Sequence, residues 1–283
     1  MNAKALLGLL GLVFIAVFLP VLWALALIWW NNPDYSHGLL IPLISGYLVW
    51  SQKDELKRAP VRPNGWGGPL VVASIILLML GKGATLLGGG YGTGGLFFMG
   101  LAFIGAVGGL VLLLLGLEFS KLLALPLLYL VFMVPLPGRV FEMVTLPLQT
   151  YATGVTTAAL QLFGIPALRE GNLITLPTMT LGVVEACSGI RSLFTLLALA
   201  AAIALSLMTK MPVWQRVLLF LSAVPVAIVT NAFRVTATGL MAHTWGREAA
   251  QGFYHDFSGW VIFVSATFLL TAEIFLLTQI AKE

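Results

Sequence analysis

Long apolar runs, separated by short polar or turn-rich stretches, dominate the pattern of hydrophobic and polar positions along the chain. Several runs reach the length of about 20 residues that a helix needs to cross the hydrocarbon core of a bilayer. Eight membrane-spanning helices are predicted, near residues 5–30, 37–50, 69–88, 95–117, 121–137, 188–208, 214–241 and 257–280. The second run is short. Thr, Gln, Pro and Gly interrupt the segment 141–163, which either spans, re-enters or lies at the membrane interface.

The longest loop, about residues 138–186, lies between the fifth and sixth predicted spans. Residues 171–177 and 179–184 alternate weakly between apolar and polar, with turn residues between them, which predicts a β-hairpin that leads into Cys187. We therefore expect an all-α integral membrane protein of about eight transmembrane helices with a short extracytoplasmic β-hairpin. It forms a single polytopic domain over residues 1–283, with no separate soluble domain.

The composition agrees with a membrane protein. Hydrophobic residues make up 59% of the chain and charged residues 9%, against about 25% charged residues in soluble domains. The first apolar run is too long for the core of a signal peptide and has no small-residue cleavage site, so we interpret it as a retained anchor. The net charge of +4 does not indicate nucleic-acid binding, because the basic residues lie in short loops beside the spans and report orientation.

The basic residues predict the orientation of the chain. The loop 51–68 is rich in Lys and Arg, whereas the loops 31–36 and 89–94 contain neither. Placing the loop 51–68 in the cytoplasm puts both termini in the cytoplasm as well. The basic residues near the outer face are then all arginines, which favours ion pairing or carboxylate recognition: Arg139, Arg169, Arg191, Arg234 and Arg247.

Cys187 is the only cysteine and precedes the sixth predicted span at its outer end. An unpaired cysteine between a carboxylate, Glu185, and a guanidinium, Arg191, is a candidate nucleophile. The alternative is that it packs as a small buried hydrophobic residue. The helix that begins near Ser188 would direct unpaired N–H groups at the thiol, which lowers a thiol pKa and can stabilise an oxyanion.

Two further candidates fall in the same outer layer. Asn231 and Arg234 are three residues apart on the seventh predicted span and share a helix face. His255 lies where the outer loop enters the eighth span. A thiolate, a guanidinium and an imidazole suffice for acyl transfer through a thioester. Alternatively, Arg234 snorkels or pairs with an acidic residue, and Asp256 satisfies His255. A metal site is not indicated, because the three His and one Cys show no zinc-ligand spacing.

These motifs resemble the exosortase/archaeosortase family. The resemblance rests on the run from Glu185 to Leu193 around Cys187, on Asn231-x-x-Arg234 and on His255-x-x-x-Gly259, and it extends from about residue 31 to 275. Asp34-Tyr35-Ser36-His37-Gly38 and Arg169-Glu170-Gly171-Asn172 are also similar to bacterial members. The resemblance implies a membrane-embedded cysteine transpeptidase whose catalytic Cys, Arg and His correspond to Cys187, Arg234 and His255. The candidate substrate-binding residues are Arg191, Asn231, Glu185, His37 and Arg169. The alternative to substrate binding by His37 is a structural role, in a cap at the entry of the helix that it forms with Asp34 or Ser36.

The resemblance also implies the partners. The substrates would be secreted proteins that end in a Pro-Glu-Pro-type (PEP-CTERM) motif, a transmembrane helix and a basic cluster. Cleavage would occur at the outer face of the bacterial inner membrane, followed by transfer to an unknown acceptor, without a cofactor. The competing interpretations are a polytopic membrane transporter or a non-catalytic envelope assembly protein. A transporter is disfavoured because the charges cluster on one side and no inverted repeat is evident.

Overall fold

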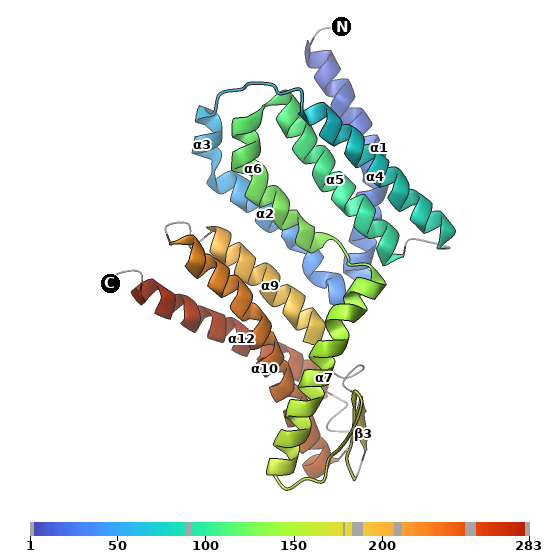
Figure 1. The fold of residues 1–283 in the computed structure, drawn as a ribbon, viewed down its shortest axis with the longest axis vertical. Helices are drawn as coiled ribbons and strands as arrows, with labels where there is room; N and C mark the ends of the chain where they lie inside the picture. The colour runs from blue at the N-terminus through green and yellow to red at the C-terminus, as the bar shows by residue number, and fades with distance from the viewer. Residues whose placement is uncertain are drawn as a thin grey trace. The chain divides into compact units, whose positions relative to one another are not determined.

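The computed structural model describes residues 3–88, 92–177, 179–182, 189–206, 211–246 and 253–280 (Figure 1). The chain forms two compact units, Met1–Val140 and Phe141–Glu283. The first unit contains, in chain order, α1 (Ala3–Asn31), η1 (Pro33–Leu39), α2 (Ile41–Ser51), α3 (Lys53–Arg58), α4 (Gly67–Leu87), α5 (Thr93–Leu114), α6 (Leu117–Tyr129) and η2 (Leu130–Met133). The helix α7 (Gly138–Leu162) begins at the boundary and belongs mainly to the second unit.

Glycine residues allow α4 and α5 to pack in backbone contact. A Cβ atom on Gly81 would lie 2.9 Å from the carbonyl oxygen of Gly95, and one on Gly109 would lie 3.0 Å from the backbone nitrogen of Val71. Small residues are a common means of bringing two membrane helices together, because lipid supplies no hydrophobic force between them. The α4–α5 hairpin therefore depends on the absence of side chains at these positions.

The second predicted span begins with a short 3₁₀ helix rather than with an α-helix. Asn32 caps η1 by accepting a hydrogen bond from the backbone nitrogen of Asp34 (3.0 Å). The cap is therefore Asn32, and neither Asp34 nor Ser36 as the sequence suggested. Gly38 lies against the indole of Trp29, whose Nε1 donates a hydrogen bond to the carbonyl of Met133 (2.8 Å). The helix α2 follows and has only 11 residues.

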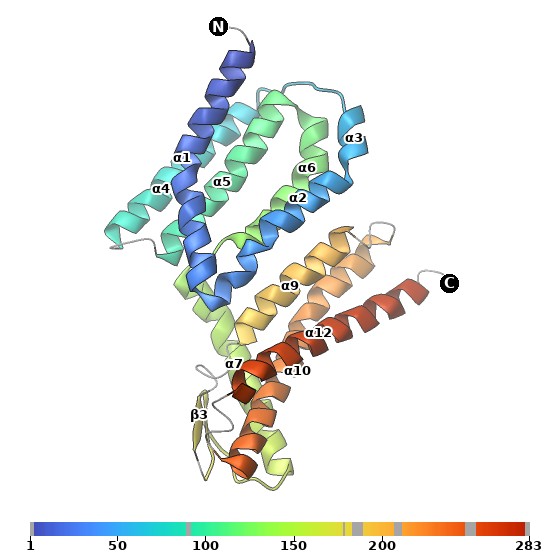
Figure 2. The same cartoon turned by 180° about the vertical axis from the view of Figure 1, so that it is seen from behind.

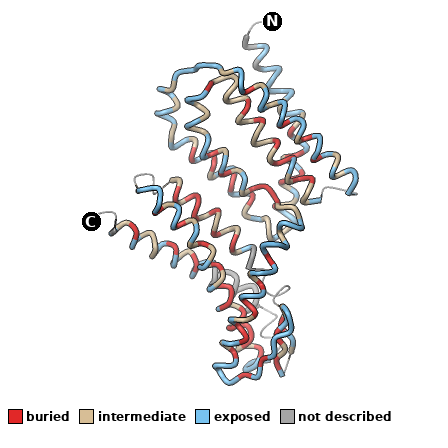
Figure 3. The backbone as a smooth tube through the Cα atoms, viewed as in Figure 1, coloured by how far each residue is buried: buried red, intermediate tan, exposed pale blue. Residues whose placement is uncertain are grey.

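The second unit contains most of α7, the strands β1 (Leu168–Glu170), β2 (Leu173–Thr175) and β3 (Thr180–Gly182), and the helices α9 (Gly189–Ser206), α10 (Val213–Trp245) and α12 (Phe253–Ile280). The helices α9, α10 and α12 lie side by side in both views (Figures 1 and 2). Buried positions follow α10 along much of its length (Figure 3), so α10 is the central helix of this unit.

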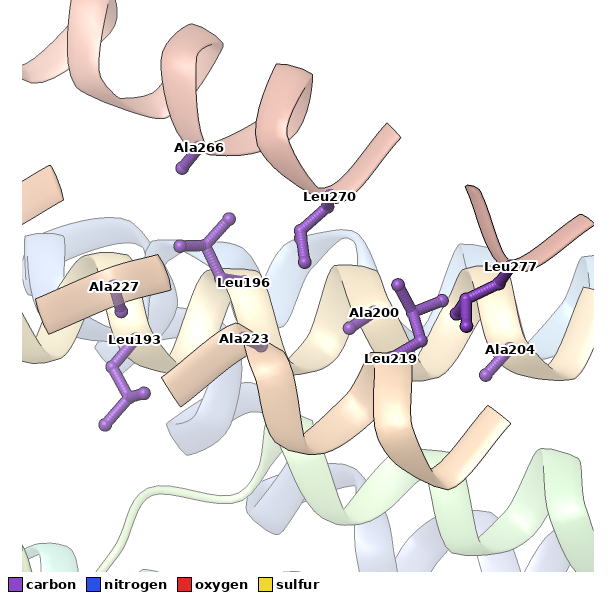
Figure 4. Close-up of a cluster of buried hydrophobic side chains, with 10 residues drawn as sticks. All are labelled: Leu193, Leu196, Ala200, Ala204, Leu219, Ala223, Ala227, Ala266, Leu270 and Leu277. Atoms are coloured by element: carbon purple, nitrogen blue, oxygen red, sulfur yellow. The ribbon is translucent and has the colours of Figure 1, made fainter. Parts of the chain in front are cut away.

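Two hydrophobic cores meet along α10. The first is formed by α9, α10 and α12 and includes Leu196, Leu219 and Leu270, all fully buried (Figure 4). The second joins α7, the sheet and α10, and its members are Ala152, Leu160, Ile165, Ala167, Ile174, Leu176, Leu181 and Val235. The two cores share α10 but use different parts of it, with Ala227 in the first and Val235 in the second.

The predicted β-hairpin is present as part of a three-stranded antiparallel sheet of order β1-β2-β3. The sequence interpretation missed β1, which pairs with β2 through the register Glu170↔Leu173. Gly171 has a φ of 62°, and this left-handed conformation at the first position of a two-residue turn is the one that glycine tolerates best. The sheet ends at Gly182, and residues 183–188 lie outside the described part of the chain.

Each of the eight predicted spans corresponds to helical structure in the described residues. Within the described residues, four helices are long and apolar enough to cross a membrane, or five if the bent pair Leu117–Met133 and Gly138–Leu162 forms one span. The four are Gly8–Asn31, Gly67–Leu87, Thr93–Leu114 and Val213–Trp245. The total of eight spans and the extracytoplasmic location of the hairpin stay predictions.

Candidate active site

The described residues include part of the proposed catalytic set. Arg234 lies on α10 and is half-buried. His255 falls in the first turn of α12, where only its backbone is described. Cys187 and Glu185 lie outside the described residues, between the end of β3 and the start of α9 at Gly189.

The direction of the helices decides which ends come together. Gln215, near the start of α10, donates from Nε2 to the carbonyl of Leu277 near the end of α12 (3.3 Å). These helices are therefore antiparallel, and the start of α12, which carries His255, is directed toward the C-terminal half of α10, which carries Arg234.

The helix α9 is also antiparallel to α10 in the three-helix core. Ala204, near the end of α9, lies with Leu219 and Leu277 at one end of the core, and Leu193 lies with Ala227 at the other (Figure 4). The start of α9, directly after Cys187 in the chain, therefore lies toward the same half of α10 as the start of α12. The elements that flank all three proposed catalytic positions converge on one end of this core.

Asn231 and Arg234 share one side of α10, as their spacing predicted. Asn231 is buried, with 6% of its surface exposed. The carbonyl of Ala232, next to Asn231, accepts hydrogen bonds from Thr236 (2.8 Å) and from Thr156 of α7 (3.4 Å). The backbone between Asn231 and Arg234 is thus held both from within α10 and from α7.

A buried polar face on α7 was missed by the sequence analysis. Thr153 and Thr156 are fully buried, and Gln149 is 6% exposed. On the other side of the same helix, large apolar side chains are exposed, among them Met143 (75%) and Tyr151 (68%). This distribution is the reverse of that in a water-soluble amphipathic helix. It suits a helix with lipid outside and a polar interior, and the turn spacing of Thr145, Gln149, Thr153 and Thr157 could have indicated it.

The Arg169-Glu170-Gly171-Asn172 motif forms the β1–β2 turn, which is attached to α7. Asn172 donates from Nδ2 to Oε1 of Gln149 (2.9 Å). Arg169 is exposed and donates from Nε to the carbonyl of Gly171 (3.1 Å). A Cβ atom on Gly154 would lie 3.1 Å from a terminal guanidinium nitrogen of Arg169. Arg169 therefore has a structural role in this turn, whatever it does for a substrate.

The other two candidates differ in their surroundings. Arg191 is exposed in the first turn of α9, in the second unit. His37 belongs to η1 in the first unit, and its Nδ1 atom is buried without a hydrogen-bond partner. The structure therefore brings Arg234 and Asn231 together, and it holds His37 in a separate unit.

The fold and the candidate site define a multi-pass membrane protein with a cluster of polar residues at one end of an apolar helix core. Residues 29–272 match the family described as transmembrane exosortase. The chain therefore belongs to the exosortase family, as its motifs suggested. Neither a curated protein nor a solved structure matches the chain.

Proposed function

We propose that this protein is a membrane-embedded cysteine transpeptidase that cleaves the C-terminal sorting signals of secreted proteins at the outer face of the bacterial inner membrane. The family match over residues 29–272 is the observation that carries the proposal. The convergence of α9, α10 and α12 at the end that carries Arg234 supports it, because acyl transfer needs a nucleophile, a proton carrier and an anion-stabilising group in one place.

In the proposed reaction, the thiolate of Cys187 attacks the carbonyl carbon of the scissile peptide and forms a C–S bond. The guanidinium of Arg234 donates hydrogen bonds to the developing oxyanion. The C–N bond then breaks, and the imidazolium of His255 gives its proton to the departing amine. An acceptor amine or water attacks the thioester, His255 takes the proton of that nucleophile, and Cys187 leaves as the thiolate.

The remaining candidates are assigned to substrate binding. Arg191 and Arg169 are the proposed partners of an acidic group in the sorting motif, because a guanidinium binds a carboxylate through two parallel hydrogen bonds. Asn231 is proposed to hold the substrate backbone beside Arg234. Glu185 and His37 complete the proposed set. The partners are a secreted protein with a C-terminal membrane helix, the surrounding lipid and an acceptor whose identity is open.

The test is co-expression with a tagged protein that ends in a Pro-Glu-Pro-type motif, an apolar helix and a basic cluster. Loss of the C-terminal helix is scored on a gel at matched membrane levels of the enzyme. Wild type should process the substrate, whereas Cys187→Ala, Arg234→Ala and His255→Ala should not. His243→Ala and Arg58→Ala are the matched controls, since both side chains are exposed outside the proposed site.

Each outcome has a distinct meaning. Continued processing by Cys187→Ala would refute the nucleophile assignment, and loss of processing in the two controls would point to a general defect in folding. The mass of the released product separates hydrolysis from transfer, because transfer adds the acceptor to the new C-terminus. A transporter or an assembly protein would leave the substrate intact with every variant.

A further inference from the structure

A carboxylate lies on the predicted eighth span, on the part of α12 remote from the candidate active site. Glu273 is half-buried and accepts a short hydrogen bond (2.5 Å) from the hydroxyl of Ser222 on α10. On α12, Leu269 and Leu276 flank it at a spacing of one helical turn and are 43% and 61% exposed. The carboxylate is thus set in an apolar, exposed surface at the seam between α10 and α12.

No cation of the described part of the chain pairs with Glu273. The ion pairs found among the described residues are Lys57–Asp54 and Lys121–Glu118, both in the first unit. On α10, Arg216 directs its guanidinium to the carbonyl of Met211 (3.1 and 2.9 Å). A carboxylate in a membrane helix is costly unless a partner compensates it, and such residues usually mark functional positions.

A second polar side chain, Gln215, lies at the same seam. Gln215 is 1% exposed, and its Oε1 atom is buried without a hydrogen-bond partner. The Nε2 atom of the same amide donates to the carbonyl of Leu277, one helical turn beyond Glu273. The seam between α10 and α12 therefore holds a half-buried carboxylate and a buried amide in otherwise apolar surroundings, and a positively charged donor is the strongest partner for the carboxylate.

We infer that the α10–α12 seam at Glu273 binds a Lys or Arg side chain carried by the membrane helix of the substrate. The inference rests on the proposed function, in which the substrate is itself anchored by such a helix. Transmembrane helices carry Lys and Arg mainly at their cytoplasmic ends. In the predicted orientation, the C-terminal end of α12 is also cytoplasmic, so the charge of Glu273 is complementary to that end of a helix lying along α12.

The position of Glu273 also fixes the distance along α12 between this carboxylate and His255. It lies 18 residues after His255 on α12, which corresponds to about 27 Å along a helix axis. A membrane helix needs about 20 residues to cross the hydrocarbon core. A substrate helix that begins near His255 therefore brings its first inner Lys or Arg to the level of Glu273. The seam would recognise the length of the substrate helix as well as its charge.

The test uses the full-length enzyme with Cys187→Ala, so that binding is measured without turnover. Leu269→Cys supplies a thiol beside Glu273, and the probe is a single-span protein with a leucine–alanine helix, one cysteine and three lysines at its inner end. Disulfide cross-linking in membranes should fall on the order of tenfold with Glu273→Gln, since a hydrogen bond to a charged group is worth about 1.5–3 kcal/mol. Glu55→Gln is the matched control, because Glu55 is exposed on α3.

A charge exchange makes the result specific. Glu273→Lys should abolish cross-linking to the lysine probe and restore it to a probe with glutamates at the same positions. Equal cross-linking with Glu273 and Glu273→Gln would overturn the inference, and so would a loss that the exchanged probe does not reverse. Failure of the proposed catalytic function would appear separately: the Cys187→Ala, Leu269→Cys enzyme would bind the probe through Glu273, whereas the wild-type enzyme would not cleave its substrate.

Discussion

Replacing Gly38 with alanine should destabilise the first unit, because the indole of Trp29 occupies the space that a side chain would need. A Cβ atom at position 38 would lie 2.4 Å from both Cδ1 and Nε1 of Trp29. The indole cannot move freely, since Trp29 is 7% exposed and its Nε1 donates to the carbonyl of Met133 at 2.8 Å. The added methyl group therefore displaces a packed ring and a hydrogen bond together.

Two contributions set the magnitude. Overpacking of a well-packed interior costs about 1–3 kcal/mol, and loss of the hydrogen bond from Trp29 adds about 1 kcal/mol. The sum is about 2–4 kcal/mol in the free energy of unfolding. For a chain of this size, that corresponds to a decrease in Tm on the order of 10 °C.

The assay is thermal unfolding of the purified protein in detergent, with Gly46→Ala as the matched control. Gly46 lies within α2, and nothing is within 4 Å of the position that its Cβ atom would take. Alanine at position 46 should leave Tm unchanged or raise it, because glycine costs about 1 kcal/mol in a helix interior. Equal Tm values for Gly38→Ala and Gly46→Ala would show that the contact between Gly38 and Trp29 is not tight.

Two other predictions follow from particular contacts. Gly116→Ala should abolish accumulation of folded protein on a gel-filtration profile, because Gly116 has a φ of 93° and its Cβ atom would lie 1.8 Å from the carbonyl oxygen of Arg62. Asn172→Ala should expose the hairpin to limited proteolysis, because its bond to Gln149 attaches the turn to α7; unchanged cleavage would argue against that attachment.

The spacing of one motif predicted a local arrangement that the structure contains. Asn231 and Arg234 share a side of one helix because three residues separate them, and local geometry alone decides that. The contacts that support this side were not predictable. Thr156 lies 76 residues from Ala232 in the chain, and Ser222 lies 51 residues from Glu273. Such contacts depend on how the helices pack, and no local pattern encodes them.

The segment 141–163 shows the same limit for the fold. Its mixed composition left spanning, re-entrant and interfacial arrangements open, whereas the structure contains one continuous helix, Gly138–Leu162. Four of its threonines and Gln149 are buried, whereas large apolar side chains such as Met143 and Tyr151 are exposed. A hydropathy average combines all sides of a helix, so it cannot tell which side faces the interior.

The sequence by itself determined the class of protein, the extent of nearly every long helix and the exosortase family. In lipid, each spanning segment must satisfy its own backbone hydrogen bonds, so a long apolar run is almost obliged to be a helix. Only the tertiary structure decided that Gly38 packs beneath Trp29, that α7 turns its polar side inward and that Glu273 meets Ser222. These features arise from side-chain packing between segments distant in the chain, where several arrangements satisfy the same hydrophobic pattern and only contact geometry selects one.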